Sequence, residues 1–94
     1  MNKEVYNLLK EIKPRLDKYH LRRLRIFGSQ ARDDYRKDSD VDLIVEFSQT
    51  PTYFKLARMK REIEEYLNKK VDIVFEHKIF PELKENILKD ATDV

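Results

Sequence analysis

The sequence predicts a small α/β (α+β) domain in which helices and strands follow one another in the order α-β-α-β-α-β-α. Three observations support this prediction. Residues 41–47 alternate apolar and polar side chains, as a half-buried strand does. Residues 3–19 carry apolar side chains at the three- and four-residue spacing of an amphipathic helix. No repeat, low-complexity segment or linker interrupts the 94 residues, so we expect a single domain over residues 1–94.

The first half of the chain predicts a helix, a strand and a second, short helix. A strand fits Leu24–Phe27, and Gly28 with Ser29 breaks it. The stretch "SQARDDY" then suits a short helix with Ser29 at or near its N-cap, and "RKDSD" is a polar loop. The preceding helix over residues 3–19 has an apolar stripe of Val5, Leu8, Leu9, Ile12 and Leu16.

The second half predicts two strands and two helices. In the strand from Val41 to Phe47, apolar side chains on one face alternate with Asp40, Asp42, Ile44 and Glu46 on the other. A strand from Val71 to Phe75 follows a helix that begins near Pro51 and ends at "LNKK". That helix has a stripe of Phe54, Leu56, Ala57, Met59, Ile63, Tyr66 and Leu67. A last helix runs from Pro81 to about Asp90, with Leu83, Ile87 and Leu88 facing inward.

Composition excludes several classes of function. The 20 basic and 18 acidic residues leave a net charge of +2, which does not favour a general nucleic-acid or membrane surface. Because the chain has no cysteine, disulfides, thiolate metal sites and cysteine nucleophiles are excluded. It also lacks a spanning apolar stretch and a signal-peptide core, so we expect a soluble, cytoplasmic protein.

Two aspartates, Asp40 and Asp42, lie on one face at the start of the second predicted strand. Their Cα atoms are expected to be about 6.6 Å apart, and at an exposed edge such a pair of charges is ordinary. Asp42 lies inside the apolar run, however, and a buried carboxylate is costly unless a cation compensates it. Asp72 holds the same place in the next strand. If the two strands are neighbours, three carboxylates meet and would select a hard cation such as magnesium.

The turn at Gly28 and Ser29 supplies a complementary feature. A strand that ends there and enters a helix offers free N–H groups and a hydroxyl to phosphate oxygens, and glycine allows a ligand to approach the backbone closely. Alone, the pair predicts only a turn. Beside an acidic metal site, it predicts a site for a nucleoside triphosphate, with in-line displacement assisted by two cations.

These residues resemble a known family. Gly28-Ser29, ten intervening residues and Asp40-Val41-Asp42 reproduce the G-S-x10-D-x-D signature of the DNA polymerase beta-like nucleotidyltransferase superfamily. The stretch "FGSQARDDYRKDSDVDLIVEF" resembles the core of its minimal nucleotidyltransferase (MNT) branch, and "KKVDIVFEHKIFPELKENILKDATDV" resembles the end of those proteins. The resemblance covers essentially the whole chain. It departs at Asp33, where relatives commonly have glycine, which affects the local turn beside the phosphate loop.

The resemblance implies a nucleotidyltransferase fold, with a small mixed β-sheet flanked by helices. It also implies a magnesium-dependent transfer of a nucleoside monophosphate to an acceptor, with release of pyrophosphate. Asp40 and Asp42 would be metal ligands, and Asp72 would complete the metal site on the nucleophile side and help deprotonate the acceptor hydroxyl. Gly28 and Ser29 would hold the triphosphate.

Arg32 has two interpretations of equal weight. It would either neutralise phosphate charge or form a local salt bridge to Asp33 or Asp38.

The resemblance further implies a partner protein. Larger superfamily members add domains that bind the acceptor, and 94 residues leave no room for one. Minimal nucleotidyltransferases are similar to the antitoxins of toxin–antitoxin pairs whose toxin is a helical HEPN ribonuclease. The implied reaction transfers AMP from ATP to a tyrosine of the toxin, where added charge opposes RNA binding. We therefore expect a hetero-oligomer with a HEPN toxin, two Mg²⁺ ions and ATP as substrate, without direct binding of nucleic acid.

Two other functions stay open at this point. In the first, the protein neutralises its toxin by stoichiometric binding alone. In the second, it is a small-molecule nucleotidyltransferase with a separate acceptor-binding subunit.

The remaining conspicuous residues favour ordinary structural roles. The basic cluster "KYHLRRLR" is expected to be a salt-bridged surface, and His20 and His77 lack metal-ligand spacing. Tyr35, Tyr53 and Tyr66 are expected to pack on the surface or in the core. Phe54, Met59 and Ile63 are expected to lie in the core rather than on a face that binds the toxin.

Overall fold

The computed structural model describes all 94 residues and contains one four-stranded sheet in the order β3-β2-β1-β4. β1 (Leu21–Phe27) pairs antiparallel with β2 (Val41–Phe47), and β2 pairs parallel with β3 (Val71–Phe75). β4 (Thr92–Asp93) pairs antiparallel with the outer side of β1. The predicted mixed sheet flanked by helices is therefore confirmed, with one strand more than the sequence predicted.

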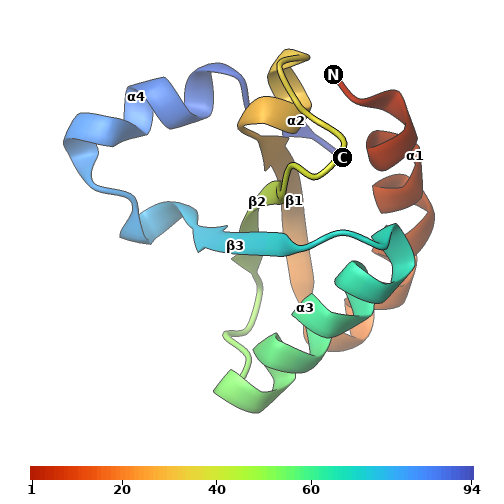
Figure 1. The fold of residues 1–94 in the computed structure, drawn as a ribbon. Helices are drawn as coiled ribbons and strands as arrows, with labels where there is room; N and C mark the ends of the chain where they lie inside the picture. The colour runs from red at the N-terminus through yellow and green to blue at the C-terminus, as the bar shows by residue number, and fades with distance from the viewer.

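Helices α1 (Lys3–Ile12) and α3 (Tyr53–Leu67) lie on the same side of the sheet, and α4 (Pro81–Lys89) lies away from both (Figure 1). The core fills the space between the sheet and the first two helices. Alternate residues of the three longer strands face this core, as the period of two requires. The fully buried apolar side chains include Leu9, Ile12, Leu16, Leu24, Ile26, Leu43, Met59 and Ile63. The other face of the sheet carries Asp42 and Asp72, together with the buried side chains of Ile44 and Arg25.

The helix predicted over residues 3–19 changes its geometry near Pro14. The α-helix ends at Ile12, and a 3-10 helix, η1 (Lys13–Tyr19), continues to the start of β1. Proline lacks the N–H group that the helical ladder needs, and its ring crowds the preceding turn. Apolar periodicity cannot distinguish the two helix types, because Leu16 is buried in either.

Helix α3 begins two residues after Pro51, with Thr52 as its N-cap. The Thr52 hydroxyl accepts a hydrogen bond of 3.3 Å from the backbone N–H of Lys55. Met59 and Ile63 are buried as expected, whereas the prediction for Phe54 was wrong: its side chain is 80% exposed. Phe54 lies in the first turn, beyond the part of α3 that contacts the sheet.

The last helix also differs from its prediction. Leu83 was expected to face inward, but it is 49% exposed, and Ile87 and Leu88 are only half-buried. The apolar spacing correctly predicted a helix, but Figure 1 shows α4 extending away from the body of the molecule, so no core lies under its apolar face. None of the helices has the length and apolar character needed to cross a lipid bilayer.

Candidate active site

The parallel pairing of β2 and β3 brings Asp42 and Asp72 side by side. They are direct partners in the register, so both side chains project from the sheet face opposite α1 and α3. Asp40 lies two residues before Asp42, on the same face and just outside β2. The predicted gathering of the three aspartates at one end of the sheet is therefore present in the backbone.

Electrostatics at this end of the sheet centre on Asp42. Partial burial raises the pKa of its carboxyl above the ordinary value of 3.8, and the negative charges of Asp72 and Asp40 raise it further. Arg32 acts in the opposite direction and lowers this pKa. The Asp42 carboxylate therefore sits in an environment that disfavours its negative charge and would favour a bound cation.

The three aspartates have no cationic partner within the protein. Asp40, Asp42 and Asp72 form no ion pair with any lysine or arginine. Their oxygens also do not converge into a preformed metal-binding group. Three mutually repelling carboxylates at one end of the sheet, none of them in an ion pair, fit a divalent ion that neutralises them on binding. Oxygen is the ligand that magnesium prefers, so the residues present match that metal.

Gly28 forms the floor beside Asp42. It adopts φ 73° and ψ −153°, a backbone conformation that side chains rarely accept, and it is the N-cap of α2 (Ser29–Arg32). A Cβ atom at this position would overlap Oδ2 of Asp42 and lie 3.2 Å from its Cγ. The predicted glycine thus brings the turn against the carboxylate. Ser29 is the first residue of α2 rather than its N-cap, with its hydroxyl at the same turn.

Sequence reasoning missed Gln30, which lies fully buried between the two halves of the site. Its Nε2 donates to the carbonyl of Ser39 at 3.1 Å and, more weakly, to that of Asp40 at 3.5 Å. Its Oε1 accepts a hydrogen bond of 2.9 Å from Asn2. Gln30 thereby ties the loop before β2 to α2 and sets the backbone position of Asp40. The available signal was a glutamine within the motif, directly after Gly28-Ser29.

Arg32 makes a local ion pair, but with partners other than those expected. It contacts Asp34 at 3.4 Å and Asp90 at 3.9 Å, rather than Asp33 or Asp38. The second contact links α2 to the end of α4. Because the side chain remains about half-exposed and acts on Asp42 through its charge, it also remains near the carboxylate end of the sheet.

Asp33, the departure from the family pattern, keeps the backbone shape that glycine would supply. It is the C-cap of α2 in the left-handed region, with φ 75° and ψ 5°. Aspartate tolerates this region better than most residues. Its carboxylate also pairs with the N-terminal amine, so the turn beside the phosphate loop is retained.

Some of the other conspicuous residues have the burial and contacts that the sequence predicted, and others do not. Most of the basic cluster forms surface ion pairs as predicted, but Arg25 is buried, with 7% exposure, and its pair with Glu76 measures 2.9 Å. His20 and His77 belong to no metal-binding group. Tyr53 is 79% exposed, and Tyr66 donates its hydroxyl to Glu11 at 2.8 Å. The surface ion pairs are Lys18–Glu62, Arg22–Glu46 and Arg23–Asp93.

Comparisons with known proteins agree with this geometry. Residues 7–94 match the family described as "Nucleotidyltransferase domain". The chain is 40% identical over 90 residues to "Putative protein adenylyltransferase MJ0435" of Methanocaldococcus jannaschii. This alignment covers 96% of the present chain and 97% of that protein. It is 27% identical over 92 residues to "Protein adenylyltransferase MntA" of Thermococcus cleftensis, covering 97% and 93% of the two chains.

Solved structures share the fold. "Structure of putative minimal nucleotidyltransferase" aligns with a TM-score of 0.82 and 34% identity over 98% of this chain and 94% of that one. A more distant neighbour, 17% identical with a TM-score of 0.58 over 98% and 66% of the two chains, is described as a tri-AMPylated Shewanella oneidensis HEPN toxin in complex with MNT antitoxin; this likeness shows the fold alone. The carboxylates, the glycine turn and the family match agree: the chain belongs to the nucleotidyltransferase domain family, in its minimal branch.

Proposed function

We propose that the chain transfers AMP from ATP to a tyrosine of a helical HEPN partner and thereby neutralises a ribonuclease toxin. The observation that carries this proposal is the register pairing of Asp42 with Asp72, with Gly28 packed against Asp42. In that arrangement, a turn that can bind phosphate lies beside carboxylates that can bind a cation, at one end of the sheet.

The reaction balances as a single displacement. The phenolic oxygen of the acceptor forms a bond to the α-phosphorus of ATP, the bond to the β-phosphate oxygen breaks, and pyrophosphate leaves. Bound magnesium would neutralise phosphate charge and stabilise the attacking and leaving oxygens. Asp40 and Asp42 would be the metal ligands. Asp72 would complete the metal site on the nucleophile side and accept the hydroxyl proton, while Gly28 and Ser29 would hold the triphosphate.

The protein acceptor is supported by the relatives. The M. jannaschii and T. cleftensis proteins are both named as protein adenylyltransferases, and the S. oneidensis neighbour is described in complex with an AMPylated HEPN toxin. We extend this to the present chain, which aligns with the M. jannaschii protein over 97% of that protein's length.

The test is the intact mass of a co-expressed helical HEPN partner, after incubation with the chain, magnesium and ATP. We expect a gain of one or more AMP units, and no gain with the Asp40→Asn/Asp42→Asn variant. An unchanged mass for the wild-type mixture, together with a stable complex, would replace transfer by stoichiometric binding. Transfer to a small molecule instead would assign the acceptor to a separate subunit.

A further inference from the structure

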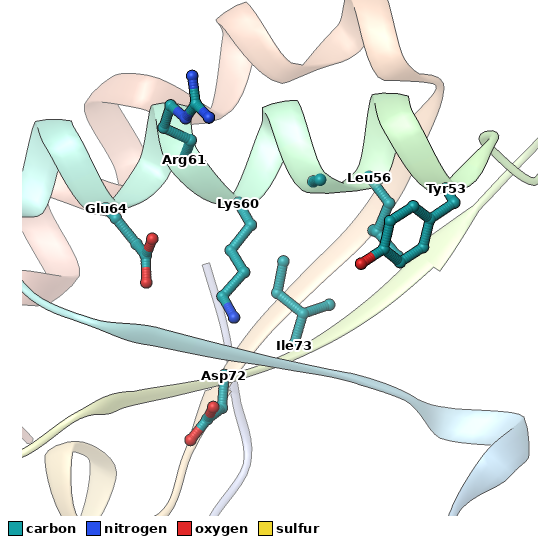
Figure 2. A pocket seen from close by; sticks show the side chains of 8 residues that line it. Tyr53, Leu56, Lys60, Arg61, Glu64, Asp72 and Ile73 are labelled. Atoms are coloured by element: carbon teal, nitrogen blue, oxygen red, sulfur yellow. The ribbon is translucent and has the colours of Figure 1, made fainter.

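A pocket of about 470 Å³ lies between α3 and β3, directly beside the third aspartate of the site. Figure 2 shows Lys60 reaching from α3 toward β3, while the Asp72 carboxylate points to the opposite side of the strand. The pocket and the Asp72 carboxylate therefore lie on opposite sides of β3, and the edge of this strand separates them. Its lining combines apolar and charged side chains: Tyr53, Leu56, Ala57, Lys60, Arg61, Glu64, Asp72 and Ile73.

The pocket runs along an unpaired strand edge. β3 is the outermost strand of the sheet, and its inner side pairs with β2. The Val41 N–H donates to the Lys70 carbonyl at 2.9 Å, and the parallel ladder then directs the N–H and C=O groups of Ile73 outward. Glu64 accepts the Val71 N–H at 2.9 Å, so the open edge begins after that residue. An open edge is a template for an added strand.

The lining of the pocket includes two basic and two acidic side chains. Glu64 accepts the Val71 N–H, and the Asp72 carboxylate points to the other side of β3, so the charges free to meet a ligand on the α3 side are basic. Lys60 and Arg61 form no ion pair, although both line the pocket. The surface continues around the start of β3 through two adjoining hollows that include Lys69 and Lys70 and that reach Asp40. Charge complementarity therefore favours an acidic ligand, while the apolar lining and the open backbone edge favour a polypeptide over a nucleic acid.

We propose that the acceptor segment of the partner protein binds here in an extended conformation, as an added strand on the edge of β3. The proposal rests on the proposed function and names how that function selects its acceptor. Side chains alternate along a strand, so an acceptor residue on the Asp72 face has its two neighbours on the α3 face, opposite Lys60 and Arg61. The preferred acceptor is a tyrosine flanked by aspartate or glutamate.

A charge reversal tests this docking. The Lys60→Glu/Arg61→Glu variant should raise the KM for the partner about tenfold, because two attractive contacts become repulsive. Calorimetric binding of magnesium-ATP should stay within twofold of wild type. The matched control is Lys55→Glu/Arg58→Glu, which carries the same charge change on the same helix outside the pocket. It should leave KM within twofold.

The outcomes separate the two proposals. If the wild-type chain transfers no AMP, the proposed function fails. If the wild-type chain transfers AMP and the pocket variant keeps its KM, the function stands and the docking site is wrong.

A second measurement does not depend on turnover or on the folding of a variant. The wild-type chain is titrated with a short Glu-Tyr-Glu peptide, a Lys-Tyr-Lys peptide and a single-stranded RNA, and backbone amide resonances are followed by NMR. The acidic peptide should shift the Ile73 amide, and the basic peptide should not. An Ile73 amide that no peptide moves would overturn the added strand. A shift with RNA alone would assign the surface to nucleic acid and overturn the proposal.

Discussion

At the scale of single residues, the site sets function against stability. Asp42 is placed where burial and two neighbouring carboxylates disfavour its charge, and the positive charge of Arg32 offsets this only in part. A residue chosen only for folding would be apolar or uncharged here. A bound cation would remove this electrostatic penalty. The Asp42 carboxylate therefore destabilises the free protein and is compensated when its ligand binds.

Replacing Asp42 with Asn should therefore stabilise the free protein at neutral pH, by up to about 1 kcal/mol after solvent screening. The folded pKa is raised above 3.8, so the penalty appears as pH rises through the folded pKa and is absent below 3.8. The measurement is urea denaturation of both proteins at pH 3.5 and pH 7.5. A variant less stable than wild type at pH 7.5 would contradict this account.

Metal binding should reverse the order of stability. Adding magnesium and a non-hydrolysable ATP analogue should raise the melting temperature of the wild type, since a ligand that binds only the folded state stabilises it. The Asp42→Asn variant should show little or no rise. Equal shifts in both proteins would place the nucleotide elsewhere.

Gln30 is the residue whose loss should damage the site without touching a ligand. The Gln30→Leu substitution keeps the volume but leaves the Asn2 amide and the Ser39 carbonyl unpaired, which should cost about 2–3 kcal/mol. Thermal or urea unfolding measures this loss. The kcat of AMP transfer should fall by a larger factor than KM changes, because the position of Asp40 becomes less well defined. Stability equal to wild type would show that the loop is held by other contacts.

At the scale of elements, the strands that could be predicted were those whose own residues show a regular spacing of apolar side chains. β2 was predicted with correct bounds, because apolar side chains recur at every second position over its seven residues. β4 was missed because two exposed residues, Thr92 and Asp93, have no period to detect. Its formation depends on the position of β1, which only the tertiary structure supplies. β1 was likewise predicted too short, because Arg22 and Arg23 interrupt the apolar sequence at its start.

The β4 pairing should make stability depend on acidity. The hydrogen bond from Arg23 lowers the pKa of Asp93 below its ordinary 3.8, so the ion pair stabilises the fold above that value and is lost as pH falls through the folded pKa. The Asp93→Asn variant should melt about 2 °C below wild type at pH 6, as for an exposed pair. The difference should vanish near pH 2. A constant difference would mean that shape, rather than charge, holds β4.

At the scale of the whole molecule, stability is expected to be uneven. The sheet centre and the two helices on its core face hold the buried side chains, whereas α4 has none. Native-state hydrogen exchange followed by NMR should find the amides of Val41–Phe47 exchanging only through global unfolding. Those of residues 82–89 in α4 should exchange through local opening at much lower free energy. Equal protection of both segments would show that α4 belongs to the same cooperative unit.

The site was more predictable than its setting. Gly28, Asp40 and Asp42 lie within one stretch of sequence, so a local pattern was enough to predict them as candidate site residues. The pairing of Asp42 with Asp72 required β2 and β3 to be parallel neighbours, which the sequence could only suppose. The buried amide of Gln30 and the pocket beside β3 arise from packing between distant segments, and no local pattern encodes them.

The contact between Gly28 and the Asp42 carboxylate has a genetic consequence. Gly28 is the only glycine in the chain, and every missense change of its codon adds a side chain at a backbone angle that resists one. A random-mutagenesis screen should therefore recover no functional alleles at codon 28, as at codons 40 and 42. A residue without a side chain would then tolerate substitution as poorly as the two candidate metal-binding aspartates, because of the space that it leaves for its neighbour.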